Sequence, residues 1–146
     1  MDQAILDFVA GRRIAVVGAS RHGRKFGNVA GAELAARGYH VVLVHPEAKE
    51  IAGAPCRPSL SAVRDEVDGV LVAVRPGVVP AVLRESAAAG LRNVWLQQGA
   101  ESPEALALAR ELGLSLVARK CVLMYAPPVR GIHRFHRALA GLFGRL

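Results

Sequence analysis

A short loop that follows an apolar run contains the residue types with the clearest chemistry in this sequence. In order, its residues are Gly18, Ala19, Ser20, Arg21, His22, Gly23, Arg24, Lys25, Phe26, Gly27 and Asn28. Small residues at its start let a ligand approach the backbone, and Ser20 offers a hydroxyl. The basic side chains add positive charge, and a helix opening at Gly27-Asn28 would point its free N–H groups at the loop. This loop is predicted to bind a phosphate ester.

The loop matches neither standard nucleotide motif. The dinucleotide fingerprint G-x-G-x-x-G needs glycine where Ser20 stands, and no Gly-Lys-Ser or Gly-Lys-Thr ends the loop as in a Walker motif. The alternative is a strand-to-helix turn that binds nothing. Mutual repulsion among several basic residues in one turn argues against that alternative, since a mere connector gains nothing from it.

Three later segments share a pattern with this loop, because each follows a predicted strand. They are His45-Pro46, Arg75-Pro76 and Gln97-Gln98-Gly99. Two place a basic or potentially basic residue before proline, and the third supplies amides that can pair with a purine edge or with pantetheine amides. Alternatively, the X-Pro pairs only terminate strands. Together with the first loop, the set favours a rim for an anionic, adenine-containing ligand.

The elements that position these segments alternate between apolar strands and helices. Strands are predicted over 14–17, 40–44, 69–74, 93–96 and 114–118, and helices over 2–10, 28–37, 78–89 and 102–113, with a short helix ending near 64 and a turn-rich stretch over 52–58. This alternation predicts an α/β fold, a Rossmann-like doubly wound parallel sheet of about five strands with helices on both faces. Ligands of such sheets lie outside the carboxyl ends of the strands, where the four segments would meet.

Length, charge and cysteine usage narrow the class further. The chain has 146 residues, the size of one domain, and its net charge of +7 favours an anionic partner. No apolar run is long enough for a membrane span, and the N-terminus lacks a signal-peptide pattern, so we expect a cytoplasmic protein. Cys56 and Cys121 stand far apart without a C-x-x-C motif, which indicates neither a zinc site nor a disulfide framework.

The C-terminal stretch has helical spacing of apolar residues. We expect residues 1–124 to form the domain and 125–146 a helical tail, with apolar positions at Val129, Ile132, Phe135, Leu139, Leu142 and Phe143. The tail would pack on the domain or on a second subunit, which makes a homo-oligomer possible. A nucleic-acid role for its arginines is the rival interpretation. The sequence has no recognisable helix-turn-helix, zinc finger or aromatic platform to support that role.

Several short motifs, in their order and spacing, resemble a known family over about residues 11–121. They are Val16-Val17-Gly18-Ala19-Ser20, Gly38-Tyr39, Val44-His45-Pro46, the turn from Gly53 to Cys56, Val74-Arg75-Pro76 and Val94-Trp95-Leu96-Gln97-Gln98-Gly99. Together they resemble the small stand-alone CoA-binding proteins, which are similar to the nucleotide-binding domain of succinyl-CoA synthetase.

This resemblance implies a Rossmann-type domain that binds coenzyme A or an acyl-CoA. It implies that the CoA phosphates lie against the loop from Gly18 to Asn28, that His45-Pro46 and Arg75-Pro76 border the nucleotide, and that the segment from Gln97 to Gly99 lies near the end of the pocket. Family members often have Asn-Pro where this chain has His45-Pro46. The basic tail after Cys121 lies outside the family pattern.

No catalytic constellation emerges from the residues. A dehydrogenase would usually place an acid at the end of the second strand, but His45 stands there and Glu47 comes two residues later, so NAD(P) is the less favoured alternative. His133 and His136 lie three residues apart, as two metal ligands on a helix can. The arginines around them would repel a cation, so a metal site is disfavoured there. Cys121 could exchange with the thiol of CoA or be a structural cysteine. We interpret the chain as a non-catalytic or accessory CoA-binding module.

Overall fold

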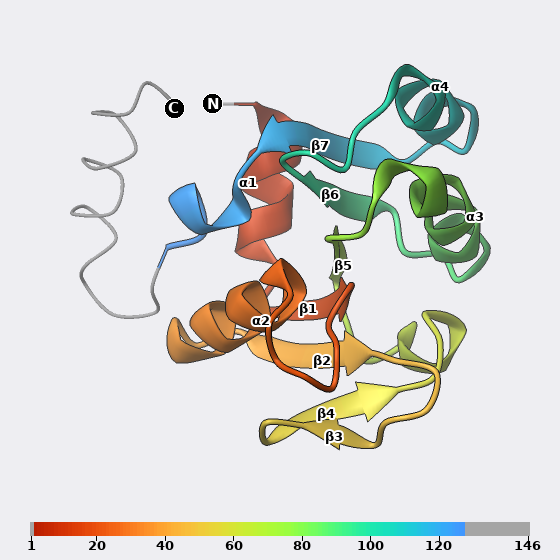
Figure 1. Cartoon of the computed structure of the whole chain (residues 1–146). Coiled ribbons are helices and arrows are strands. Elements are labelled where there is room, and N and C mark those ends of the chain that lie inside the picture. Colours follow the sequence, from red (N-terminus) through yellow and green to blue (C-terminus); the bar gives the residue numbers. More distant parts are fainter. Residues whose placement is uncertain (1, 128–146) are drawn as a thin grey trace.

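The computed structural model describes residues 2–127 of the chain, drawn in Figure 1. The helix predicted over 129–143 and both metal-spaced histidines lie outside these residues. Within them, Tyr125 and Ala126 are buried in the same apolar cluster as Trp95. The described chain therefore stays packed on the domain up to the point where the description ends.

A seven-stranded sheet forms the centre, in the order β3-β4-β2-β1-β5-β6-β7. Its strands are β1 (Arg13–Val17), β2 (His40–Val44), β3 (Glu50–Ile51), β4 (Ala54–Arg57), β5 (Gly69–Val72), β6 (Asn93–Gln97) and β7 (Ser115–Lys120). Every pairing from β4 to β7 is parallel, and only β3 runs antiparallel to its neighbour β4. The Rossmann-like fold class predicted from the sequence is confirmed, and β3 and β4 are additions to the five predicted strands.

Helices cover both faces of the sheet. The helices α1 (Gln3–Ala10) and α2 (Phe26–Ala36) pack on one face, and α3 (Val79–Ala88) and α4 (Pro103–Glu111) pack on the other (Figure 1). Three short 3-10 turns are η1 (Ser61–Val63), η2 (Pro76–Val78) and η3 (Val122–Met124). Asp2 and Ser102 cap α1 and α4, because their side-chain oxygens accept the N–H groups of Ala4 and Ala105.

Alternating residues of each central strand supply two apolar layers. In β1, Ile14 and Val16 face the layer under α1 and α2, whereas Ala15 faces the layer under α3 and α4. Trp95 is fully buried in the first layer, where its ring meets Phe8 edge-on at 5.3 Å, and its indole N–H donates to the carbonyl of Lys120 at 2.8 Å. This contact ties α1 and the end of β7 to the centre of the sheet.

The β3–β4 hairpin lies where the sequence predicted only turns. Its two-residue connection, Ala52-Gly53, has positive φ at both positions, 50° and 84°. Such backbone geometry matches the twist of the flanking strands, as in type I′ hairpins. The hairpin extends the sheet beyond β2 and supplies its outer edge.

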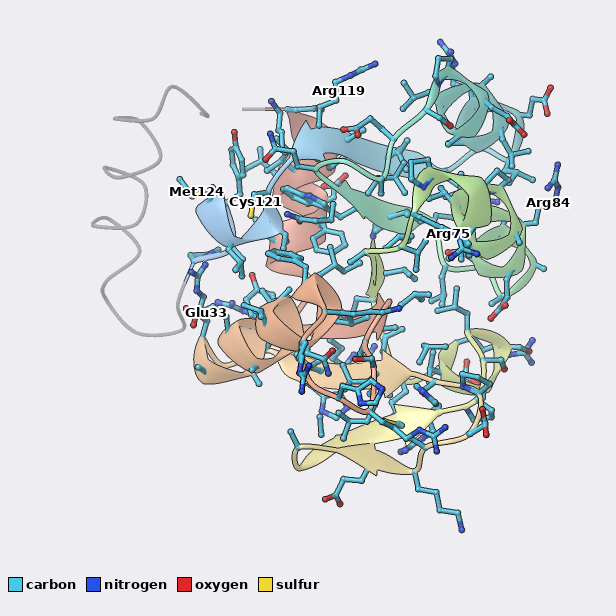
Figure 2. The ribbon with its side chains drawn as sticks, viewed as in Figure 1. Glu33, Arg75, Arg84, Arg119, Cys121 and Met124 are labelled. Carbon is cyan, nitrogen blue, oxygen red and sulfur yellow. The ribbon has the colours of Figure 1, made fainter. Side chains whose placement is uncertain are left out.

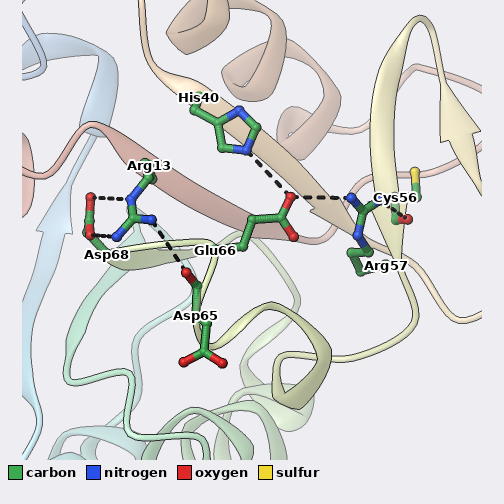
Figure 3. A network of polar contacts seen from close by, with 7 residues as sticks. All are labelled: Arg13, His40, Cys56, Arg57, Asp65, Glu66 and Asp68. Carbon is green, nitrogen blue, oxygen red and sulfur yellow. Dashed lines mark hydrogen bonds and ion pairs between the residues drawn. The ribbon is translucent and has the colours of Figure 1, made fainter.

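A polar network closes the amino end of β1 and β2 (Figure 3). The guanidinium of Arg13 makes two bonds to the Asp68 carboxylate, at 2.7 and 3.2 Å, and a third to the backbone carbonyl of Asp65. Nearby, the Glu66 carboxylate lies between His40 and Arg57. The hydrogen bond from Arg13 lowers the pKa of Asp68 below its ordinary value. The network fastens the segment after η1 to the strands. Arg13 and His40 lie at the amino ends of β1 and β2, whereas Arg57 ends β4 and its carbonyl accepts the N–H of His45 at 2.9 Å.

Candidate functional site

The structure brings all four predicted segments to one edge of the sheet. They follow β1, β2, β5 and β6, which are neighbouring parallel strands, so their carboxyl ends point the same way. The ends of β1 and β5 are paired at Val17 and Val72. From β1 the chain crosses through α2 to β2, and α3 follows β5 on the opposite face. The strand order thus reverses between β1 and β5, and this is where open α/β sheets bind ligands.

Two glycines in the first loop allow close approach of backbone to backbone. Gly18 has φ of 122°, and a Cβ there would overlap the carbonyl oxygen of Ala73 after β5. A Cβ on Gly27 would lie 2.6 Å from the carbonyl oxygen of Gly18. Gly18 therefore allows the chain to turn sharply at the end of β1. Gly27 allows the first helical turn of α2 to pack directly against the backbone of Gly18. Both glycines were identified from the sequence. The close approach of Gly18 to Ala73 was not, because no sequence pattern indicates it.

The side chain of Asn28 clasps the backbone of Ser20. Its Oδ1 accepts the Ser20 N–H at 2.9 Å, and its Nδ2 donates to the Ser20 carbonyl at 2.9 Å. These two bonds hold the small-residue start of the loop against α2. The sequence predicted Asn28 as a ligand contact, and the structure shows it fixing the loop. The Ser20 N–H is consequently occupied within the protein.

The first turn of α2 is open toward the loop. Lys25 occupies the N-cap position and makes no side-chain capping bond. Among residues 2–127 no acceptor is found for the backbone N–H groups of Phe26 and Gly27. Unpaired N–H groups and the positive end of the helix dipole together favour an anion at this position.

Exposed basic side chains lie in the first loop and directly after β5. Arg21 pairs with Glu47 at 3.7 Å, which links the first loop to the segment after β2. Within the described residues, no carboxylate lies in ion-pair distance of Arg24, Lys25 or Arg75. Arg75 follows β5 and precedes α3 (Figure 2). The rim thus carries positive charge that its own carboxylates leave uncompensated.

His45 shapes the segment after β2. Its Nδ1 accepts the backbone N–H groups of Glu47 and Ala48, at 3.1 and 3.0 Å. An asparagine side-chain oxygen can accept in the same kind of turn, so the Nδ1 of His45 does here what an asparagine before Pro46 would do.

The segments after β5 and β6 use their predicted residues in different ways. Pro76 opens η2 directly after Arg75. Gln97 is only 8% exposed, and its Oε1 accepts the backbone N–H of Val122 at 3.1 Å. Gln98 is exposed, and the Gly99 N–H donates to the carboxylate of Glu101. Gln97 therefore supports the turn after β7, while Gln98 and Gly99 lie at the surface.

Other candidate chemistry is sparse in the described part of the chain. Cys121 is partly exposed beside η3 (Figure 2), and Cys56 is buried in β4, which raises the pKa of its thiol. Residues 2–127 hold no group of three or more histidines, cysteines or carboxylates that could bind a metal. The same residues include no helix with the length and apolarity needed to cross a membrane.

An apolar groove begins beside the loop and follows α2. Its volume is about 670 Å³, and it separates α2 from the β3–β4 hairpin. Gly23 and Asn28 line its end nearest the loop, and further along it is lined mainly by small or aliphatic residues: Val29, Gly31, Ala32, Ala35, Val41, Leu43, Ile51, Ala52, Gly53, Ala54 and Pro55. This groove could not be predicted from the sequence, because the hairpin that forms one of its walls was not predicted.

Known proteins share this architecture. A conserved hypothetical protein from Pyrococcus furiosus is 34% identical, with a TM-score of 0.72 over 76% of this chain and 96% of that one. A hypothetical protein from Pyrococcus horikoshii is 29% identical, with a TM-score of 0.76 over 97% of this chain and 93% of that one. Acetate–CoA ligase (ADP-forming) I from Archaeoglobus fulgidus is 28% identical in an alignment 121 residues long, and the match covers 76% of this chain and 18% of the ligase.

The family comparison covers most of the chain. Residues 12–127 match the family described as CoA binding domain, a span that includes all four segments at the sheet edge. Family membership supports an association with coenzyme A and does not favour the NAD(P) or nucleic-acid alternatives. The chain belongs to the CoA-binding domain family.

Proposed function

We propose that this protein binds coenzyme A or an acyl-CoA at the carboxyl edge of the sheet, with the phosphates held by the loop from Gly18 to Asn28. The observation that carries the proposal is the junction of Gly18 and Gly27, which seats the open first turn of α2 at the strand-order reversal. A ligand phosphate there would accept the N–H groups of Phe26 and Gly27, which have no acceptor among the described residues.

The rim chemistry suits the charge of CoA. The ligand carries a diphosphate and a ribose phosphate, and Arg24, Lys25 and Arg75 are exposed around the turn without carboxylate partners in the described chain. Arg21 is drawn toward Glu47 and contributes less net charge. We assign Arg24, Lys25 and Arg75 to the phosphates, because guanidinium and ammonium groups make strong charge-assisted hydrogen bonds to phosphate oxygens.

The remaining segments would border the rest of the ligand. His45-Pro46 and Arg75-Pro76 flank the ends of β2 and β5 on either side of β1, so they would enclose the nucleotide between them. The exposed segment Gln98-Gly99 lies beyond β5 and would approach the pantetheine arm, whose amides match the Gln98 amide. Gln97 would not contact the ligand itself and would support the site indirectly, because its side-chain oxygen accepts the N–H of Val122.

The proposed role is that of a binding module without its own catalytic step. The similarity to the Archaeoglobus fulgidus ligase covers 18% of that protein, so the ligase's activity is not carried over to this chain. Within residues 2–127, the candidate edge does not assemble a nucleophile with a base or a pair of carboxylates in contact. Calorimetry with CoA and acetyl-CoA would show whether both are held with similar affinity, as expected for a carrier or sensor.

Loop variants test the placement. Ser20→Leu should weaken CoA binding, because the larger side chain blocks approach to the loop backbone. Arg24→Glu combined with Lys25→Glu should also weaken it, more at low salt than at high salt, since exposed charges are screened over about 10 Å at 0.1 M. Arg64→Glu with Arg84→Glu reverses two exposed arginines that have no ion-pair partner among the described residues and serves as the control.

The outcome is measured as the dissociation constant of CoA by calorimetry. Unchanged affinity in Ser20→Leu, or equal losses in the loop and control charge variants, would contradict placement of the phosphates at this loop.

A further inference from the structure

One ion pair joins two of the segments at the candidate edge. The Nη2 atom of Arg21, in the first loop, lies 3.7 Å from the Oε2 atom of Glu47, which follows β2. In Figure 1 the loop between β1 and α2 reaches down to the carboxyl end of β2, and these two strands are neighbours in the sheet. The pair therefore connects two segments that would border the proposed ligand.

Both side chains of this pair can change partners. The side chain of Arg21 is 60% exposed and that of Glu47 is 70% exposed. Neither makes a further ion pair or side-chain hydrogen bond with another residue between 2 and 127. An exposed pair contributes little free energy, because water and salt screen it. A phosphate, which binds a guanidinium through several strong hydrogen bonds, can therefore replace the Glu47 carboxylate.

The backbone that carries Glu47 is fixed, although its side chain is exposed. The Nδ1 atom of His45 accepts the N–H groups of Glu47 and Ala48, at 3.1 and 3.0 Å. The N–H of His45 donates to the carbonyl of Arg57 at 2.9 Å. An exchange of partners thus requires movement of two side chains only, those of Arg21 and Glu47.

The position of the pair indicates which phosphate is involved. In doubly wound sheets, the end of the second strand borders the ribose of a bound nucleotide, and a nearby arginine can accommodate a phosphate on that ribose. CoA carries such a phosphate at the 3′ position. Arg21 is the loop residue that reaches the segment after β2, whereas Arg24 and Lys25 have no carboxylate within ion-pair distance in the described chain.

We propose that Glu47 holds Arg21 until CoA binds, and that the ribose 3′-phosphate of CoA then replaces Glu47 as the partner of Arg21. The inference rests on the proposed function, because it concerns the same site. Arg21 then favours CoA over dephospho-CoA, which lacks the 3′-phosphate. Glu47 lowers the apparent affinity for CoA, since only molecules with Arg21 released can offer it to the phosphate.

Calorimetry on four forms of the full-length chain tests this exchange. They are the wild type, Glu47→Gln, Arg21→Gln and the double variant, and each is titrated with CoA and with dephospho-CoA at low and at high salt. Glutamine keeps the size of the Glu47 side chain and removes its charge. At low salt, Glu47→Gln should bind CoA about two- to fivefold more tightly than the wild type, as expected from loss of an exposed ion pair. The gain should shrink at high salt, where the pair is screened.

The gain should require both Arg21 and the 3′-phosphate. Glu47→Gln should change the affinity much less in the Arg21→Gln background, and much less for dephospho-CoA. Arg21→Gln alone should lower the affinity for CoA more than the affinity for dephospho-CoA. The matched control is Glu50→Gln, which removes an exposed carboxylate on β3 that forms no ion pair with another described residue. Its effect should be the same with and without Arg21.

Three results would overturn the proposal. If Glu47→Gln weakened CoA binding, Glu47 would itself hold the ligand, for example through a ribose hydroxyl. An equal gain with dephospho-CoA would assign Arg21 to another part of the ligand, and an equal gain in the Arg21→Gln background would show that Glu47 acts without Arg21. Wild-type protein that does not bind CoA would refute the proposed function as well, whereas normal wild-type binding without the Glu47→Gln gain would refute the exchange alone.

Discussion

The clasp between Asn28 and Ser20 gives the sharpest prediction about the candidate site. Asn28→Ala removes two hydrogen bonds of 2.9 Å to the Ser20 backbone, both partly buried. A typical bond contributes about 0.5–1.5 kcal/mol net, so the free energy of unfolding should fall by about 1–3 kcal/mol. The loop would also lose its fixed form before the ligand arrives, and CoA should bind more weakly for that reason.

Asn28→Asp distinguishes the loss of the hydrogen bonds to Ser20 from the loss of side-chain volume. The carboxylate keeps an acceptor for the Ser20 N–H, but it places a second oxygen where the amide nitrogen met the Ser20 carbonyl at 2.9 Å. It also brings negative charge next to the proposed phosphates. We expect this variant to lose more CoA affinity than Asn28→Ala, and to regain part of that loss at high salt.

Urea unfolding and CoA calorimetry are measured on the same preparations, with Asn93→Ala as the control. Asn93 is also partly buried, but its 3.5 Å contact with the Asp68 carbonyl lies at the amino end of the sheet. The control should lower stability slightly and leave CoA affinity unchanged. The reasoning fails if Asn28→Ala unfolds at the wild-type urea concentration and binds CoA with wild-type affinity.

Two further predictions concern the scaffold. Arg13 lowers the pKa of Asp68 below the ordinary carboxyl value of 3.8. The pair therefore stabilises the fold fully at pH values above 3.8, and this stabilisation is lost as the pH falls through the lowered pKa. Asp68→Asn should make the free energy of unfolding depend less on pH in this acidic range. Asp65→Asn should not, because Asp65 contacts Arg13 only through its backbone carbonyl. Ala52 has φ of 50°, so Ala52→Asn should raise the free energy of unfolding by up to about 1 kcal/mol, and Ala52→Val should lower it. Equal melting temperatures for the two Ala52 variants would refute the second prediction.

The main architecture was predictable because its signals are local. Continuous apolar runs such as 14–17 and 41–44 identify strands buried on both faces, and glycines or X-Pro pairs mark where they end. Parallel strands separated by helices then bring the segments after them to one edge. The position of the candidate site follows from this topology alone.

The hairpin was missed because its signals are weak. Its strands have two and four residues, and β4 contains Pro55, which argues against a strand. Its turn is Ala-Gly, although Asn-Gly is the usual sequence for positive φ at both positions. Without the hairpin, the groove along α2 could not be foreseen.

Side-chain roles at the site depend on partners that are distant in sequence. Gln97 was interpreted as a ligand contact, but its oxygen is bound to the N–H of Val122, 25 positions later. The approach of Gly18 to Ala73 likewise depends on how β1 and β5 pair. Residue type predicted which groups could bind a ligand, and only the folded structure shows which of them already have a partner.

Thermal unfolding of the full-length protein with CoA, and separately with NAD at the same concentration, tests the central claim most directly. A ligand at one hundred times its dissociation constant stabilises the native state by about 2.7 kcal/mol, so the shifts rank the two affinities. We predict a clear rise in melting temperature with CoA and a smaller one with NAD. No shift with CoA, or a larger shift with NAD, would contradict the account.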